Sequence, residues 1–169
     1  MKPGYKFIDH TADILFQAEA GNLADLFEQC ALALEETQVD LSLVEPKNKL
    51  LITEKNSTPE RLLFDFLDDL VFHKDSDLLI FSKFEIKINE KDGEYFLTCN
   101  AYGEKIDHKK HDPKVDVKAI TMHMFEVKKV KEEVKSEVKK EVKAPVKKEV
   151  KKPDLEREYV IPLREKCRP

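Results

Sequence analysis

The sequence predicts an α+β fold, a two-layer arrangement in which helices cover one face of a mixed β-sheet. Two segments, residues 22–34 and 58–71, place apolar residues at the three- and four-residue spacing of an amphipathic helix. Other segments alternate apolar and polar residues, as half-buried strands do. The one-sided helices and the one-sided strands each need the other to bury their apolar faces, so a single two-layer domain follows.

The chain opens with a short apolar run at residues 5–8 and continues with an alternating strand at residues 14–20. Between them, at a turn, stands the run Asp-His-Thr-Ala-Asp of residues 9–13. Two carboxylates and an imidazole within five residues offer ligands for a hard cation or a polar docking point. The alternative is a polar turn in which Asp9 and Thr11 bond their own backbone amides. The spacing by itself leaves both interpretations open.

Each helix has a start signal. Asn22 is a capping residue and Asp25 lies near the positive end of the first helix dipole. In the second helix Thr58 is the cap and Pro59 takes the first turn. The apolar stripes are Leu23, Leu26, Phe27, Cys30, Ala31 and Leu34 in the first helix, and Leu62, Leu63, Phe66, Leu67, Leu70 and Val71 in the second.

The remaining strands are expected from period-two alternation. Residues 84–88 and 95–101 alternate on either side of the Asp-Gly pair at residues 92–93, which predicts a hairpin. Residues 115–119 form a further strand, and residues 50–52 a shorter one.

Residues 128–152 are different in kind. They hold 11 lysines and 5 glutamates, and valine and lysine each recur every four residues. On a helix this repeat sets like charges at i and i+4, and Pro145 interrupts the backbone. With so much charge the segment cannot bury enough apolar area to offset its ordering entropy. We interpret it as low-complexity sequence that is disordered or transiently helical.

The predicted organisation is therefore a domain at residues 1–127, the charged segment at 128–152, and a final strand and tail at 153–169. The return strand is expected around residues 157–161, which makes the charged segment an insertion in a hairpin loop, where added length costs little. The alternative is that the fold ends before the repeat and the rest is tail. A domain that lacks this edge strand is the less plausible of the two.

Charge and cysteine content exclude several classes of protein. The whole chain carries −4 and residues 128–152 carry +6, which leaves −10 on residues 1–127. An acidic body argues against direct binding to phosphate backbones, so we expect the protein to contact RNA through a protein partner. The three cysteines, Cys30, Cys99 and Cys167, lie far apart, and Cys30 and Cys99 are expected to be buried. Without a membrane-length apolar run or a signal peptide, a cytoplasmic location is expected.

The run at residues 9–13 resembles the signature of the archease family, small proteins that assist the RNA ligase of tRNA splicing. The resemblance covers roughly residues 3–127 and fails after Val127. Further similar segments follow in the family's order, at residues 44–47, 62–70, 81–85, 103–104 with His111, and 117–123.

The resemblance implies a mixed sheet with helices packed on it, and it implies that Asp13 binds a divalent metal ion, calcium or magnesium. The family's other ligands are an aspartate in the last strand and the terminal residue. Here Pro162 and Leu163 stand at those places and six more residues follow, so the metal site is incomplete.

Other polar residues are candidates for a partner-facing surface. They are Asp9 and His10 beside Asp13, and Lys118 and His123, which the resemblance places near the same end of the sheet; the alternative for the last two is a solvated strand face. The run His108-x-x-His111-Asp could hold a metal ion, but the lysines within it favour a solvated loop, with a structural role for His111.

The resemblance implies a non-catalytic activator of the RtcB-type 3′-phosphate tRNA ligase, which promotes guanylylation of the ligase histidine. From the acidic charge of the body, we expect RNA to be contacted only through the ligase. No nucleophile motif or phosphate-binding glycine loop is present, and the chain has only 4 glycines. The alternatives are a metal-dependent hydrolase that uses Asp9, His10 and Asp13, and a modulator of a tRNA methyltransferase or a chaperone. A homo-oligomer stays open.

Overall fold

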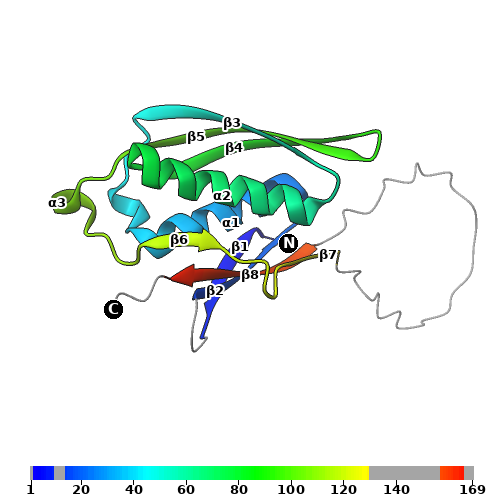
Figure 1. Cartoon of the computed structure of the whole chain (residues 1–169), viewed down its shortest axis with the longest axis horizontal. Helices are drawn as coiled ribbons and strands as arrows, with labels where there is room; N and C mark the ends of the chain where they lie inside the picture. The colour runs from blue at the N-terminus through cyan, green and yellow to red at the C-terminus, as the bar shows by residue number, and fades with distance from the viewer. Residues whose placement is uncertain (1, 10–13, 130–156, 166–169) are drawn as a thin grey trace, which may run out of the picture.

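The computed structural model describes residues 2–9 and 14–129, and the backbone of residues 157–165. Two antiparallel sheets enclose the two long helices (Figure 1). The elements are β1 Gly4–Ile8, β2 Ile14–Ala20, α1 Leu23–Gln38, η1 Leu41–Leu43, β3 Asn48–Asn56, α2 Pro59–Asp77, β4 Leu79–Lys91, β5 Glu94–Lys105, α3 His108–His111, β6 Val117–Ile120, β7 Glu126–Lys129 and β8 Arg157–Glu165.

The α+β class is confirmed, but the expected single mixed sheet with helices on one face is wrong. The first sheet has the order β1-β2-β8-β6, with β7 also paired to β8, and the second has the order β3-β5-β4. All pairings among the described strands are antiparallel. Alternation along a sequence shows which side of a strand is buried, but it does not show which strands pair.

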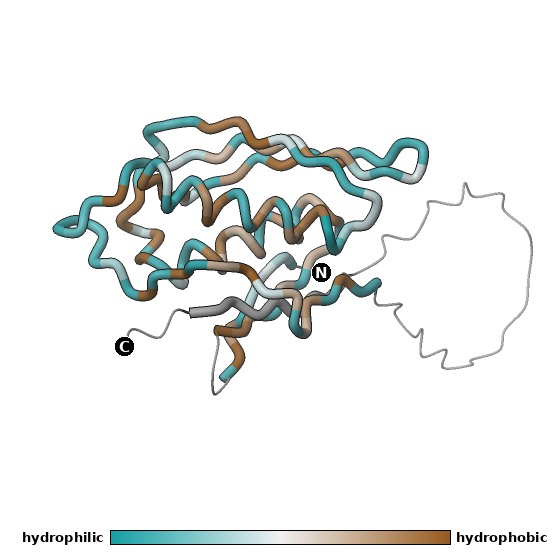
Figure 2. The backbone as a smooth tube through the Cα atoms, in the orientation of Figure 1, coloured by the Kyte–Doolittle hydropathy of each residue, from teal (hydrophilic) through white to brown (hydrophobic). Residues whose placement is uncertain are grey.

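The helices α1 and α2 form a middle layer because each packs on both sheets. α1 contacts β2 and β4, and α2 contacts β3 and β6. Both predicted caps are present: the Asn22 side chain accepts from the Asp25 N–H at 2.9 Å and Thr58 accepts from the Arg61 N–H at 3.3 Å. Apolar residues run along both helices, and polar residues gather at the connecting loops (Figure 2). No helix in the described part of the chain is both long and apolar enough to cross a membrane.

The last strand, β8, lies inside the first sheet. It pairs with β2 on one side and with β6 and β7 on the other. The return strand expected around residues 157–161 is therefore longer than expected and is not an edge strand. Residues 130–156, which include all of the charged segment except its first two residues, lie outside the described residues, so the division of the chain at 127 and 152 stays a prediction.

In the remaining strands, the sequence predicts the turn correctly but not the bounds of the strands. The Asp-Gly turn between β4 and β5 is present, with positive φ at both residues (54° at Asp92 and 78° at Gly93). The short strand expected at residues 50–52 is the nine-residue β3. The strand expected at 115–119 begins two residues later, at Val117.

Candidate functional site

The hairpin between β1 and β2 carries the run of residues 9–13. Asp9 follows β1 directly and is exposed. His10 and Asp13 lie outside the described residues, so their expected roles stay predictions.

Strand register shows which other residues reach this end of the first sheet. Ile14 of β2 and Ile120 of β6 both pair with Leu163 of β8. These three residues therefore lie side by side in the sheet, in the row where β2 begins after the hairpin. Beyond this row β6 contains a bulge: Val117 pairs with Glu165 and Ala119 with Arg164. The extra residue of the bulge is Lys118. Bulges re-aim side chains and are frequent beside functional sites.

Lys118 is held as a cation. Its Nζ lies 2.7 Å from Asp116 Oδ2 and 3.4 Å from Asp75 Oδ1. The hydrogen bond to Asp116 raises the pKa of Lys118 above its ordinary value. Burial raises the pKa of Asp116, but hydrogen bonds from Lys118 and Lys74 outweigh this effect, so the pKa of Asp116 is lowered. A charged, half-exposed lysine suits an anionic partner rather than proton abstraction.

Lys74 anchors this arrangement from α2. Its ammonium group is buried and lies 2.6 Å from both Asp116 Oδ1 and the Val117 carbonyl oxygen. Because these contacts fix residues 116 and 117, they also fix the bulge that presents Lys118.

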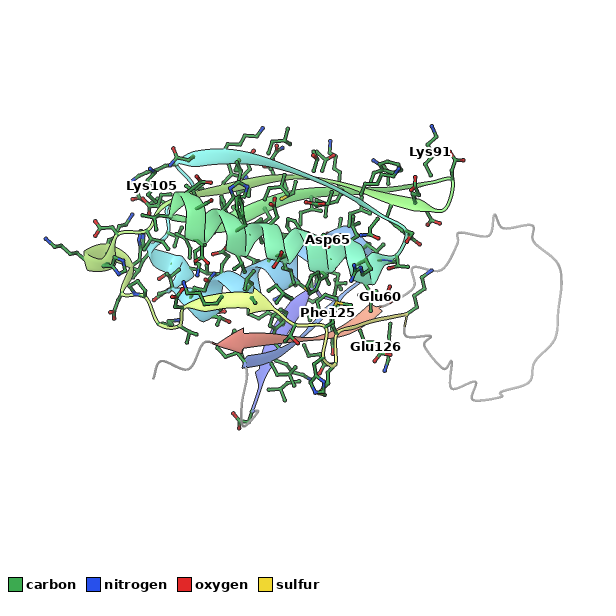
Figure 3. All side chains as sticks on the ribbon, viewed as in Figure 1. Glu60, Asp65, Lys91, Lys105, Phe125 and Glu126 are labelled. Carbon is green, nitrogen blue, oxygen red and sulfur yellow. The ribbon has the colours of Figure 1, made fainter. Side chains whose placement is uncertain are left out.

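His123 lies farther from the hairpin. The loop between β6 and β7 runs alongside the middle of β8, since β6 ends opposite Leu163 and β7 begins opposite Val160. Phe125 (Figure 3) is buried and anchors the loop by an edge-to-face contact with Phe64, with ring centroids 5.8 Å apart. His123 is exposed. The structure thus brings Lys118 and Asp9 to one end of the sheet and leaves His123 along its side.

The described residues do not complete a metal site. Residues 2–9 and 14–129 contain no group of three His, Cys, Asp or Glu side chains placed to hold a metal ion. Pro162 and Leu163 pair with Leu15 and Ile14 and supply no carboxylate. Glu165, which sequence reasoning missed, is an acidic residue that β8 brings to this end, opposite Val117. Only the pairing of β8 with β6 reveals that Glu165 lies at this end of the sheet.

The expectation of a solvated loop at residues 108–112 is wrong for His111. This residue ends the short helix α3, and its side chain is fully buried. His108 is exposed, so the two histidines do not form a metal pair. The role of His111 is structural, as expected, because its ring bonds to Glu104 and to the Asp107 backbone.

The two described cysteines are buried, as predicted. Burial raises the pKa of the Cys30 thiol, and it raises that of Cys99 to about 12. Both groups are therefore thiols and not thiolates at neutral pH, which removes them as nucleophiles.

Comparison with known proteins agrees with this fold. Residues 5–150 match the model of the Archease protein family (MTH1598/TM1083). The chain is 39% identical over 126 residues to protein archease of Pyrococcus furiosus, an alignment that covers 75% of this chain and 89% of that protein. It is 41% identical over 124 residues to protein archease of Methanothermobacter thermautotrophicus, covering 73% and 88%. The solution structure of Methanobacterium thermoautotrophicum protein 1598 matches with a TM-score of 0.72 and 33% identity, over 95% of this chain and 98% of that one. This chain belongs to the archease family.

Proposed function

We propose that this protein activates an RtcB-type 3′-phosphate tRNA-splicing ligase by promoting guanylylation of the ligase histidine, and that it has no catalytic activity of its own. The observation that carries the proposal is the family match over residues 5–150, together with relatives that are about 40% identical over most of their length. The ligase is the partner associated with this family.

The end of the first sheet that holds the β1–β2 hairpin is the proposed contact surface. It offers the carboxylate of Asp9 and the fixed cation of Lys118. A ligase site that binds guanine nucleotide and metal ions is basic, so an acidic hairpin is complementary to its rim. Lys118 would face phosphate or carboxylate groups of the same assembly.

We propose further that Asp13 gives one carboxylate to a divalent ion, calcium or magnesium, in the assembled complex. The absence of a carboxylate at Pro162 and Leu163 favours completion of the ligand set by the ligase. Glu165 is the second residue of this chain that we propose for the site, on the strength of its register position.

The test is a guanylylation and multiple-turnover ligation assay with the cognate ligase. Asp13→Ala and Lys118→Met should each abolish most of the stimulation while the melting temperature stays near that of the wild type. Glu90→Gln and Lys109→Met, at exposed positions on β4 and α3, are the matched controls and should stimulate fully. Full stimulation by Asp13→Ala would remove the hairpin from the mechanism, and no stimulation by the wild type would overturn the proposed function.

A further inference from the structure

The second sheet has one face on the helices and one face open. Residues of the inner face, such as Ile52 and Cys99, are buried in the core shared with α1 and α2. No described element covers the other side, which we call the outer face (Figure 1). Side chains stand out from it, away from α2 (Figure 3). The register gives four outward rows across β3, β5 and β4: Lys49–Tyr102–Lys83, Leu51–Asn100–Glu85, Thr53–Thr98–Lys87 and Lys55–Phe96–Asn89.

The outer face is basic, although the body is acidic. Its four rows contain four lysines and one glutamate, a net charge of +3, whereas residues 1–127 carry −10. Lys83 pairs with Glu85 at 2.9 Å, and Lys55 pairs with Glu94, beyond the last row, at 2.6 Å. Lys49 and Lys87 make no ion pair with any described residue and are exposed.

Four acidic residues lie together on another surface. Asp65, Asp68 and Asp69 project from α2, and Glu54 comes from the inner side of β3. Burial, followed by the charges of Asp65 and Asp69, raises the pKa of Asp68. The negative charges of these residues therefore lie close enough to act on one another. The net charge of residues 1–127 therefore does not describe the charge of the outer face.

Two aromatic rings lie among the lysines of the outer face. Tyr102 and Phe96 are both on the central strand β5, half-buried, and six residues apart, or about 20 Å along a strand. Lys83 Nζ lies 5.0 Å from the centroid of the Tyr102 ring, and Lys49 Nζ lies 5.9 Å from it. Lys55 Nζ lies 5.2 Å from the centroid of the Phe96 ring.

This combination has a specific chemistry. Single-stranded nucleic acids bind to open sheet faces by stacking bases on aromatic rings while lysines neutralise the phosphates. The outer face supplies both parts of such a site, because a lysine ammonium group lies within 6 Å of each ring centroid. We propose that the outer face binds single-stranded nucleic acid, with bases on Tyr102 and Phe96 and phosphates on the flanking lysines. The distance between the rings is comparable with the shortest sites, about 4 nucleotides, of OB folds.

The proposal goes beyond ligase activation and uses none of the residues at the hairpin end of the first sheet. It also revises the expectation that RNA is met only through the ligase, because that expectation was drawn from net charge. Because the outer face has four lysines and no arginine, its affinity for single-stranded nucleic acid should be modest and should fall as the salt concentration rises. Each phosphate contact adds about −0.7 to the slope of log affinity against log salt concentration, so the outer face accounts for a slope of about −3.

The test is fluorescence anisotropy of a labelled 12-nucleotide oligouridylate titrated with the full chain at several salt concentrations. Lys49→Gln with Lys87→Gln should weaken binding about tenfold at low salt and reduce the slope by about 1.4. Phe96→Leu with Tyr102→Leu keeps the charge and should weaken binding at least about fivefold with the slope unchanged, as expected for lost stacking. Lys6→Gln with Lys109→Gln is the matched control and should bind like the wild type.

The lysines of residues 128–152 are present in every variant, so they add the same background to each titration. The DNA oligomer of matching sequence shows whether the ribose hydroxyl contributes, and ultraviolet cross-linking should label peptides that contain Phe96 or Tyr102. Equal affinity of the wild type and both outer-face variants would overturn the proposal. A loss confined to the lysine variant, with polyglutamate competing as well as RNA, would also overturn it and indicate an acidic protein partner.

Discussion

His111 and Glu104 form a buried hydrogen bond whose direction follows from a second contact of the imidazole. The Asp107 backbone N–H donates to His111 Nδ1 at 2.9 Å, so the ring hydrogen is on Nε2, which donates to Glu104 Oε1 at 3.1 Å. The histidine is therefore neutral. Glu104 also accepts the Glu45 backbone N–H at 2.8 Å, and so joins β5, α3 and the loop before β3.

Glu104→Gln should make the protein less stable at neutral pH and less sensitive to acid. The Glu45 N–H and the Lys110 ammonium hold the pKa of Glu104 well below its ordinary 4.5. A depressed pKa in the folded state gives stability that is present above 4.5 and is lost as the pH falls below it. We expect a loss of about 1–3 kcal/mol in urea unfolding at pH 7 and a smaller difference at pH 3. Glu90→Gln is the exposed control, and equal stability of both variants at pH 7 would contradict the prediction.

Glu35 should give the opposite pH dependence. Its carboxyl group is fully buried and neither oxygen makes a hydrogen bond of good geometry. Burial raises the pKa to about 8, although the nearby Phe81 N–H and the Lys74 charge lower it in part. The folded state keeps the proton up to about pH 8, whereas the unfolded chain loses it above 4.5, so stability falls as the pH rises between these values.

Glu35→Gln removes this titration. The wild type should lose up to about 1.4 kcal/mol per pH unit through Glu35 in that window, and the variant should not. Unfolding free energies of both proteins at pH 5, 6.5 and 8 provide the measurement, with Glu90→Gln as the control. A constant difference between the Glu35→Gln variant and the wild type across the three values would show that Glu35 does not titrate there.

Gly103→Ala should be severely destabilising. A Cβ atom at Gly103 would lie 1.8 Å from the Ile80 carbonyl oxygen and 2.7 Å from Phe81 Cα. Both are backbone atoms next to the β4 bulge at residues 81–83. The rotation of a side chain therefore cannot relieve the clash. We expect a loss of about 3 kcal/mol or more by chemical denaturation. Gly21→Ala is the control, because nothing lies within 4 Å of its Cβ position, and it should be nearly neutral.

Asp13→Ala should cost little folding free energy, within about 0.5 kcal/mol, because the sequence places this residue after an exposed turn. Since Pro162 replaces the family's second carboxylate, calcium and magnesium should bind the isolated protein only weakly by calorimetry. Tight binding that Glu165→Gln abolishes would show that β8 completes the site without the ligase.

Replacement of residues 131–152 by a short glycine-containing turn should leave the melting temperature nearly unchanged. The sequence predicts this, because the lysine rows repel one another and Pro145 breaks the repeat. A large fall in melting temperature would instead mean that the valines of the repeat pack on the body.

The sequence by itself determined the features that depend on neighbours along the chain. Asn22 and Thr58 start their helices because a cap bonds an amide three residues away, and the Asp-Gly pair turns β4 into β5 because both residues tolerate positive φ. The motif at residues 9–13 and the segments after it were enough to indicate the family.

Tertiary structure decided which distant residues meet. Alternation could not separate the strands into two sheets or place β8 between β2 and β6, because pairing joins segments more than a hundred residues apart. The bulge at Lys118 and the burial of His111 depend on contacts with β8 and Glu104 that no local pattern encodes. Net charge is a sum over the whole chain. Only the register of β3, β5 and β4 shows that four lysines, one glutamate and two aromatic rings share one face of the second sheet.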